Sequence, residues 1–549
     1  MRIRINKFFV AHGWLIWALG VACIVILCWF AFLPEKGLNY FFSSDAVYLP
    51  SLYRDFFQDG YTLNGWRLNQ ATNFFPDMPL FFLLNALFDD FITATFCYSL
   101  IQYFFIILLM YLIFKQLKPK FSSSIFALAI FLFSSFLFIL FIDWNVWFSS
   151  LLLHNAFHNS AFILSLICVI LFLKYLNHKS GKTLIAICTL TIVGGACDKL
   201  FFIYFSIPIS LVIIVLYFFN KDWKTLAKFL ITLALGTILA ILLWLLFKNN
   251  PYFSLTKPYG EFTLFHIKDS WVTFSKQMYG YLTKLSFISV LTYLSLLTYF
   301  AVVIYVFVKT SGIVKKRKSI DNMCVFQLFV LFFTPIVIFT PVLAGSYDNV
   351  ASLRYNYFPY ILLPFNVVVL LSNCLDKNKL FKIILNTTLS VLIMGYLFFH
   401  FSVMEFGNGL KHFFVFYPEK AKIIEHYFSD DDNFKFGIAD DYWAAKQVTM
   451  FSKKGLRIYC SWDSGNPWLH ASNKYWFTDN DKGRHAHCEF TFFLWSKHKE
   501  VPDFFKDNND LQPIDLGNWN LYFVAPYRFI ESEYRLTPVL IEKSANLVK

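Results

Sequence analysis

Four carboxylates gather in one polar segment of the chain, residues 39–82. They stand among aromatic residues, glycines and two arginines: Asp45, Asp55, Asp59 and Asp77. A carboxylate among aromatic side chains is partly desolvated, which raises its pKa and suits it to act as a general base toward a hydroxyl or an amine. Asp45 directly follows the first long apolar run, and it is the first candidate for that role.

Two of these acids also have structural explanations. Ser43, Ser44 or Asp45 could cap a helix with the sequence VYLPSLYRDFF, and spacing alone favours the cap over catalysis. Asp59 precedes a glycine and fits a turn. The apolar segment that follows, residues 79–88, is too short to cross a bilayer, and we expect it to lie in the membrane interface.

Basic residues that could bind a phosphate stand at the ends of apolar runs. Arg354 and Tyr355 belong to the segment SYDNVASLRYNYFPY (346–360), and a guanidinium there could hold a phosphate through two parallel hydrogen bonds. Arginine and tyrosine also anchor helices at membrane interfaces, and the residues leave both interpretations open. His158 and Lys199 could add to a phosphate site, although each alone more often simply meets water.

The C-terminal region is rich in aromatic residues: Tyr442, Trp443, Trp462, Trp468 and Trp476. Aromatic faces stack on the C–H surfaces of sugars, but in a small domain they more often form the core. Cys460 and Cys488 are a disulfide candidate if the compartment is oxidising. His485 and His487 beside Cys488 lack a spaced partner pair, so we expect no metal site; no cofactor is certain, and a divalent cation stays open.

Composition places these residues in a membrane protein. Of 549 residues, 57% are hydrophobic and 15% are charged, whereas a soluble chain carries about a quarter charged residues. Apolar runs of roughly twenty residues recur through residues 1–404, and each can span a bilayer as a helix. We expect a polytopic α-helical membrane domain of about eleven spans, at 14–33, 96–114, 122–142, 157–173, 183–197, 200–219, 229–247, 285–308, 322–344, 357–375 and 383–401.

The distribution of lysine and arginine predicts which side each loop faces. These residues cluster in alternate short loops, which the positive-inside rule assigns to the cytoplasm together with the N-terminus. The same clusters account for the net charge of +13 without a nucleic-acid partner. Residues 39–90, residues 248–284 and the region from residue 405 then face the outside. The first span has no cleavage site behind it and is predicted to be a retained anchor.

Residues 405–549 are predicted to form one small extracytoplasmic α/β domain. Helices are expected at 418–428 and 440–451, and strands at 434–438, 456–460, 490–494 and 521–524. Asp440 or Asp441 could cap the second helix. The first of these helices, PEKAKIIEHYF, shows apolar residues at helical spacing.

The sequence also argues against two classes of function. It contains no P-loop, no dinucleotide-binding glycine fingerprint and no HExxH motif. The predicted spans hold almost no ionisable side chains, whereas carriers place such groups inside the bilayer along a pathway. Charged residues stand instead at the outer ends of spans, which favours a reaction at the membrane surface over transport through it.

This layout resembles the GT-C class of membrane glycosyltransferases, which use polyprenyl-phosphate sugars and include protein O-mannosyltransferases and lipid A aminoarabinose transferases. SSDAVYLPSLYRDFF is similar to the catalytic-aspartate segment of that class, and NFFPDMPLFFLLNAL to its juxtamembrane helix. RYNYFPYILLPF looks like the Arg-Tyr stretch of a late span, and GIADDYWAAKQVTMFS like the entry to the outer domain. Asp45 lacks the usual adjacent acid, which leaves Asp55 and Asp77 as candidate catalytic partners.

The resemblance implies an inverting hexosyl- or pentosyltransferase of a bacterial inner membrane. It would transfer a sugar from a polyprenyl-phosphate donor to an envelope glycan, lipid or protein, with Asp45 as general base. The implied donor-binding residues are Arg354, Tyr355, Lys199 and His158, and the acceptor-binding candidates are Arg67, Trp443 and Trp462. The alternatives are a polysaccharide or lipid transporter or flippase, and a non-catalytic envelope-assembly protein. Convergence of the polar residues on one outer cavity would favour the enzyme.

Overall fold

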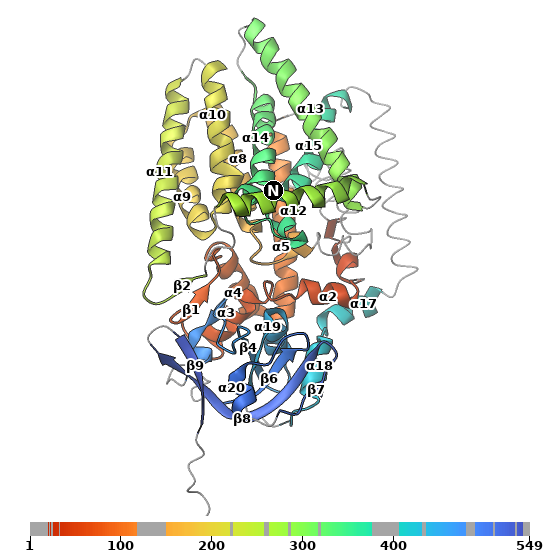
Figure 1. Cartoon of the computed structure of the whole chain (residues 1–549). Coiled ribbons are helices and arrows are strands. Elements are labelled where there is room, and N and C mark those ends of the chain that lie inside the picture. Colours follow the sequence, from red (N-terminus) through yellow and green to blue (C-terminus); the bar gives the residue numbers. More distant parts are fainter. Residues whose placement is uncertain are drawn as a thin grey trace, which may run out of the picture.

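The computed structural model of the chain describes residues 20–117, 150–219, 223–256, 263–283, 287–316, 320–375, 406–430, 435–478, 489–508, 511–532 and 535–541, apart from positions 21, 24, 25 and 32. These residues form a bundle of long helices with a smaller domain of strands and helices at one end (Figure 1). Residues 35–88 follow the first predicted span and are called the first outer segment, after the side of the membrane predicted for them. Their short helices lie between these two parts.

Six helices among the described residues are long and apolar enough to cross a bilayer. They are α5 (Phe91–Leu117), α8 (Asn159–His178), the run Phe202–Phe219 that ends in α10 (Ile207–Phe219), α11 (Trp223–Lys248), residues 292–312 of α13 (Phe287–Lys316) and α14 (Asn322–Leu343). The shorter helices α9 (Gly181–Cys197) and α15 (Phe358–Leu375) occupy two more predicted runs. The runs 122–142 and 383–401 lie outside the described residues, and only half of the run 14–33 is described, so the number eleven stays a prediction.

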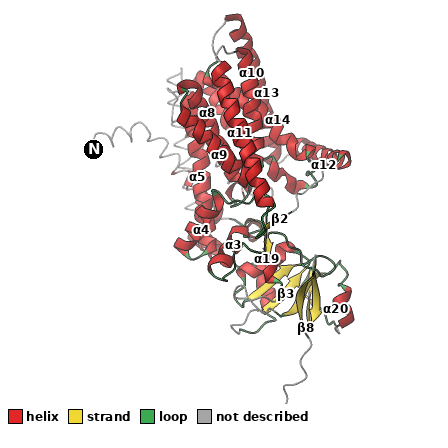
Figure 2. Ribbon diagram, turned by 90° about the vertical axis from the view of Figure 1, so that its left-hand side faces the viewer, coloured by secondary structure: helices red, strands yellow, loops and turns green. Residues whose placement is uncertain are grey.

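Exposed apolar side chains cover the outside of the bundle. Leu246 on α11 and Leu297 on α13 are 68% and 69% exposed. Large exposed apolar surfaces mark a partner or a membrane, and on helices of spanning length lipid is the natural covering. Helix α12 (Leu264–Thr283) crosses the bundle and projects from its side instead of running along it (Figure 2).

Three short helices shape the segment behind the first predicted span: α2 (Glu35–Phe41), α3 (Tyr48–Phe57) and α4 (Asp77–Phe88). The N-cap residue of α3 is Val47, and no side chain caps this helix. The predicted cap by Ser43, Ser44 or Asp45 is therefore wrong, and the Asp45 carboxylate has a different partner. Helix α4 has 12 residues, a length of about 18 Å, which is too short to span a bilayer, as predicted.

The C-terminal domain is built on a six-stranded sheet with strand order β4-β3-β6-β8-β7, in which β9 pairs with β8. The strands are β3 (Lys435–Ala439), β4 (Leu456–Cys460), β6 (Phe490–Ser496), β7 (Ile514–Asp515), β8 (Trp519–Ser532) and β9 (Arg535–Leu540). Its helices are α17 (Phe406–Phe414), α18 (Glu419–Glu425), α19 (Tyr442–Phe451) and α20 (Asp503–Asn508). Asp441 caps α19. The predicted strands and helices are confirmed here, whereas the domain boundaries stay a prediction.

A second, three-stranded sheet joins segments that are far apart in the sequence. Strand β1 (Trp66–Leu68) pairs in parallel with β2 (Ser254–Leu255) and antiparallel with β5 (Ser472–Asn473). Just before β1, the Gly65 N–H donates to the Tyr252 carbonyl at 2.8 Å, and the Gly65 carbonyl accepts from the Lys474 N–H at 2.9 Å. The small sheet thus fixes the first outer segment both to the loop after α11 and to the C-terminal domain.

We predict that Gly65→Ala destabilises the protein more than Gly517→Ala. Both glycines have a φ of +82°, which costs an alanine about 1–2 kcal/mol. A Cβ at Gly65 would also lie 2.7 Å from Asn473 Oδ1 and from the Tyr475 ring, whereas nothing lies within 4 Å of one at Gly517. Thermal unfolding of the two purified variants measures the difference. Equal losses of stability would contradict a tight fit at the small sheet.

Candidate active site

A cavity of about 850 Å³ lies where the helical bundle meets the sheet domain. Five of the residues predicted to bind the donor or to act as base line it: Asp45, His158, Lys199, Arg354 and Tyr355. They come from the first outer segment, the start of α8, the turn after α9, and the short helix η2 (Val350–Tyr355). Segments separated by more than three hundred residues therefore contribute to one wall of the cavity.

An ion pair joins Asp45 to Arg354. Arg354 Nη1 lies 3.5 Å from Asp45 Oδ2, and Arg354 Nη2 donates a hydrogen bond to the Tyr355 hydroxyl at 2.9 Å. The side chains of Arg354 and Asp45 are 26% and 23% exposed, so water or a ligand in the cavity can reach both. Because a ligand can reach the Arg354 guanidinium, its N–H donors can bind a phosphate in place of the Asp45 carboxylate.

A second acid–base pair lies beside the first. His158 Nδ1 is 2.6 Å from Asp198 Oδ2, and the backbone N–H of Leu200 donates to Asp198 Oδ1 at 3.0 Å. The rings of His158 and Tyr355 have centroids 6.0 Å apart. Asp198 thus fixes the orientation of the imidazole. Tyr355 contacts one member of each pair, Arg354 and His158.

The backbone around the cavity is strained at three positions. Asn73, Ala156 and His158 have φ values of +56°, +59° and +60°, and all three line the cavity. Residues other than glycine adopt this region at a cost of about 1–3 kcal/mol, and such positions cluster at functional sites. The π-helical turn η1 (Phe202–Ser206), which contributes Ile203 to the wall, is a second irregularity of a kind often found at such sites.

Lys199 is an exposed cation in the turn after α9 and lines the cavity. Its Nζ lies 3.4 Å from the centroid of the Trp244 ring. Partial burial lowers the pKa of Lys199, and the nearby charge of Lys248 lowers it further, more than Asp198 raises it. An anion bound in the cavity would raise the pKa of Lys199 again, because an opposite charge favours the protonated amine.

Asp55 lies away from the cavity, in the contact between α3 and the C-terminal domain. It is 1% exposed, and both its oxygens accept from Trp476 Nε1, at 3.1 and 2.9 Å. Burial outweighs the opposing charge of Arg54 and raises the pKa of Asp55 to about 8. The residue is not among those that line the cavity. Its position corrects the expectation that Asp55 assists Asp45 in catalysis.

Asp77 lies beneath the cavity wall and is also outside the lining. It is buried at the start of α4, where Tyr98 donates to Oδ1 and the Ser160 hydroxyl donates to Oδ2 at 2.7 Å. Burial raises the pKa of Asp77 to about 6, and the charge of Asp198 adds to the rise. Asp77 therefore supports the turn that presents His158, and the structure does not place it in contact with the cavity.

The three acceptor-binding candidates occupy different places. Trp443 lines the cavity and is 49% exposed. Trp462 is 55% exposed and Arg67 is an exposed residue of β1, and neither is among the lining residues. Cys460 is buried at the end of β4 and is a free cysteine, so the structure does not form the predicted disulfide with Cys488, which itself lies outside the described residues.

No group of three or more His, Cys, Asp or Glu side chains within the described ranges is arranged to hold a metal ion. His485, His487 and Cys488 fall outside those ranges. The expected absence of a metal site and the open question of a divalent cation therefore both stay predictions.

Several cavity residues were not among the predicted site residues. They belong mainly to the C-terminal domain: Asp440, Trp468, His470, His498 and Lys499. A signal for them was present, because Asp440 directly follows a predicted strand that leads into a helix. Ligands of open α/β sheets bind at the carboxyl ends of the strands, and that rule points to Asp440.

Comparison with known proteins gives one distant similarity to report. No protein-family model matches the chain, and no curated protein matches it. Among solved structures, it is similar to the oligosaccharyltransferase of Archaeoglobus fulgidus, crystallised in complex with zinc and sulfate. The identity is 12% and the TM-score is 0.42, over 87% of this chain and 68% of the other. At these values the similarity supports no conclusion about function.

We predict that Asp55→Asn makes the stability less dependent on pH. The raised pKa of Asp55 means that the folded state keeps a proton which the unfolded chain releases, so stability falls as pH rises from about 4 to about 8. The slope is at most about 1.4 kcal/mol per pH unit for one group. An asparagine can still accept from Trp476 but cannot titrate.

Thermal unfolding of the wild type and the variant between pH 5 and pH 8 measures this slope. Asp503→Asn is the control, because that carboxylate is 89% exposed and should leave the slope unchanged. A slope for Asp55→Asn as steep as that of the wild type would contradict the assignment.

Proposed function

We propose that this protein is a GT-C-type membrane glycosyltransferase that moves a sugar from a polyprenyl-phosphate donor to an acceptor at the outer face of the membrane. The observation that carries the proposal is the Asp45–Arg354 ion pair in a cavity at the end of the helical bundle, with His158 and Lys199 on the same wall. A scaffold protein has no need for these groups to meet.

The step that these residues support is an inverting displacement. The acceptor hydroxyl attacks the anomeric carbon, the bond from that carbon to the phosphate oxygen breaks, and the lipid phosphate leaves with the bonding electrons. Asp45 takes the hydroxyl proton as the new bond forms. No nucleotide takes part, because the lipid phosphate is itself the leaving group.

Arg354 has two successive roles in this proposal. In the free protein its guanidinium holds Asp45 through the ion pair. When the donor phosphate binds, the guanidinium turns to that phosphate and stabilises the charge that develops as the phosphate leaves, which is usually the largest single contribution to such catalysis. Asp45 is then released to accept a proton. The exposed Lys199, which lines the same cavity, is the second cation available to the phosphate.

We predict that Asp45→Asn abolishes sugar transfer and leaves the protein folded. An amide keeps the shape of the carboxylate but cannot accept the proton, and loss of a general base costs about 10²–10⁴-fold in rate. The surface-glycan composition of cells that lack the protein and express either form measures transfer. Asp89→Asn is the control, because Asp89 is an exposed left-handed cap of α4 where asparagine fits. Normal composition with Asp45→Asn would refute the role of Asp45.

Arg354 gives a graded test. We predict that Arg354→Gln lowers the transfer rate by about 100-fold or more, and that Arg354→Lys lowers it less, because lysine keeps the charge but not the paired donors. Membranes supplied with a radiolabelled polyprenyl-phosphate sugar report the rate. The control is Arg528→Gln on β8, an exposed residue that is not among the cavity-lining residues. Full activity of Arg354→Gln would contradict the donor site.

A further inference from the structure

The sheet domain turns its carboxyl edge toward the cavity. Strands β3, β4 and β6 run parallel, with β3 in the middle. Successive strands thus lie on opposite sides of β3, and the chain reverses its direction of travel across the sheet there. In open α/β sheets such a switch point leaves a crevice at the carboxyl ends of the strands, where ligands bind. Asp440 follows β3, and Ser496 ends β6; both line the cavity.

A series of aromatic rings borders this crevice. The ring centroids of Trp462 and Trp468 are 5.2 Å apart, and those of Trp468 and His470 are 5.3 Å apart in a stacked arrangement. Tyr442 lies 5.3 Å from Trp468 and 5.7 Å from Trp443. All of these rings except Trp462 line the cavity, and Trp462 continues the series onto the exposed surface.

The two ends of this ring series are exposed. Trp462 and Trp443 are 55% and 49% exposed, which is a large apolar area to leave in water unless a ligand covers it. These rings are therefore more than the core of a small domain. Burial, followed by the charges of Lys446, Arg354 and Arg67, lowers the pKa of His470 to about 4, so its ring is neutral at neutral pH. The same interaction puts His470 within electrostatic reach of Arg354.

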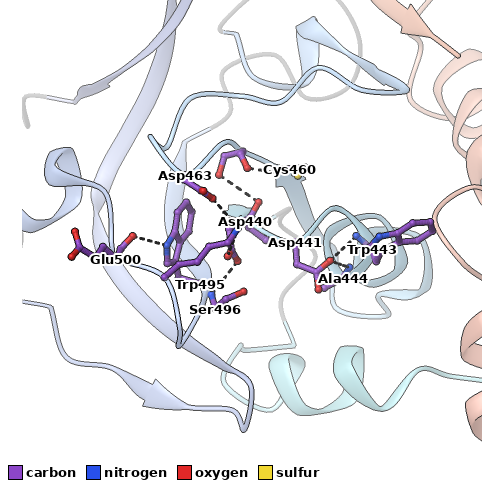
Figure 3. Close-up of polar contacts among 12 residues, drawn as sticks. Asp440, Asp441, Trp443, Ala444, Cys460, Asp463, Trp495, Ser496 and Glu500 are labelled. Carbon is purple, nitrogen blue, oxygen red and sulfur yellow. Dashed lines mark hydrogen bonds and ion pairs between the residues drawn. The ribbon is translucent and has the colours of Figure 1, made fainter. Parts of the chain in front are cut away.

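Hydrogen-bonding groups surround the rings. Asp440 Oδ1 accepts from the Ser496 N–H at 3.0 Å, and Lys499 Nζ lies 3.3 Å from Asp440 Oδ2 and 2.8 Å from Asp463 Oδ1. Figure 3 shows Asp440 near Asp463, and Asp441 at the start of the helix that carries Trp443. The Asp440 carboxylate is buried and holds Lys499 in place, whereas the side chains of Lys499 and Asp463 are 32% and 75% exposed. The ammonium group of Lys499 can donate to a hydroxyl, and the Asp463 carboxylate can accept from one.

The combination fits a carbohydrate better than a peptide or a phospholipid headgroup. A peptide that adds a strand needs a free sheet edge, whereas the edge strand β4 is buried along its whole length. A phospholipid headgroup carries negative charge, and the Asp441 carboxylate lines the crevice with the buried Asp440 carboxylate beside it. Pyranose rings offer both an apolar C–H face for the tryptophans and hydroxyls for the charged groups.

We propose that the crevice at the carboxyl ends of β3, β4 and β6 is a glycan-binding site in which Trp443, Trp462 and Trp468 stack on the pyranose units of the acceptor. This inference rests on the proposed glycosyl transfer and narrows its acceptor from glycan, lipid or protein to a carbohydrate chain. The glycan enters over Trp462 and presents one hydroxyl to Asp45. The Asp45 segment contacts the Trp443 end of the ring series, where the Ser44 hydroxyl donates to the Trp443 carbonyl at 3.3 Å.

The test is a binding titration with purified full-length protein in nanodiscs. The probes are soluble oligosaccharides of two to six units with gluco, manno, galacto and N-acetylglucosamine configurations, followed by quenching of tryptophan fluorescence and by calorimetry. We expect saturable binding of at least one series, weakened on the order of tenfold by Trp462→Ala and by Trp468→Ala. Trp462→Phe keeps a ring and should bind within about threefold of the wild type.

Two further variants separate this inference from the proposed function. Phe523→Ala removes an exposed ring of β8 that does not line the cavity, and it should leave binding unchanged. Asp45→Asn should bind oligosaccharides normally even though it cannot transfer. The glycan site is refuted if no oligosaccharide binds, if binding survives loss of the tryptophans, or if peptides alone bind there. Active Asp45→Asn with intact, tryptophan-dependent glycan binding would refute the transfer mechanism and leave the glycan site standing.

Discussion

The position of the first outer segment, held between the helical bundle and the sheet domain, determines the geometry of the whole cavity. Strand β1 is paired on both sides, and the Asp55–Trp476 hydrogen bonds fix α3. Just after α3, Asp59 Oδ2 lies 3.4 Å from Arg54 Nε, and Asp59 Oδ1 lies 3.8 Å from Arg457 Nη2. Each buried polar group left without its partner would cost about 1–3 kcal/mol. The segment therefore has one favoured position, and Asp45 at its start has one favoured place.

The different surroundings of Asp45 and Asp55 give the two carboxylates different roles. Both are aspartates of the same outer segment, yet Asp55 is sealed against Trp476 and Asp45 is about a quarter exposed beside Arg354. A partly exposed ion pair contributes little to stability, on the order of 0–1 kcal/mol. Arg354 can thus exchange Asp45 for another anion at small cost, whereas Asp55 cannot leave its partner without loss of the interface.

The sequence predicted the helical membrane part, the α/β domain and most of its strands, because apolar runs and period-two patterns are local signals. It also predicted the group of residues that meet in the cavity, since charges at the outer ends of spans must gather on one face. It ranked Asp45 first from its position but could not show that Asp55, its candidate partner, lies outside the cavity. Their partners, Arg354 and Trp476, stand hundreds of residues further along the chain, and no local pattern specifies such contacts.

Both parts of the fold bring cations and carboxylates to the cavity. Arg354 and Lys199 lie beside Asp45 and Asp198, and the sheet domain adds Asp441 and Lys499. Net charge alone therefore does not divide the cavity between two substrates. Within the proposed function, Arg354 and Lys199 attract the anionic lipid phosphate, and the aromatic rings of the sheet domain accommodate an uncharged, hydroxyl-rich acceptor. Asp45 is placed beside both groups, because it pairs with Arg354 and its neighbour Ser44 donates to the Tyr442 carbonyl at 3.1 Å. A sugar would pass from one substrate to the other at this point.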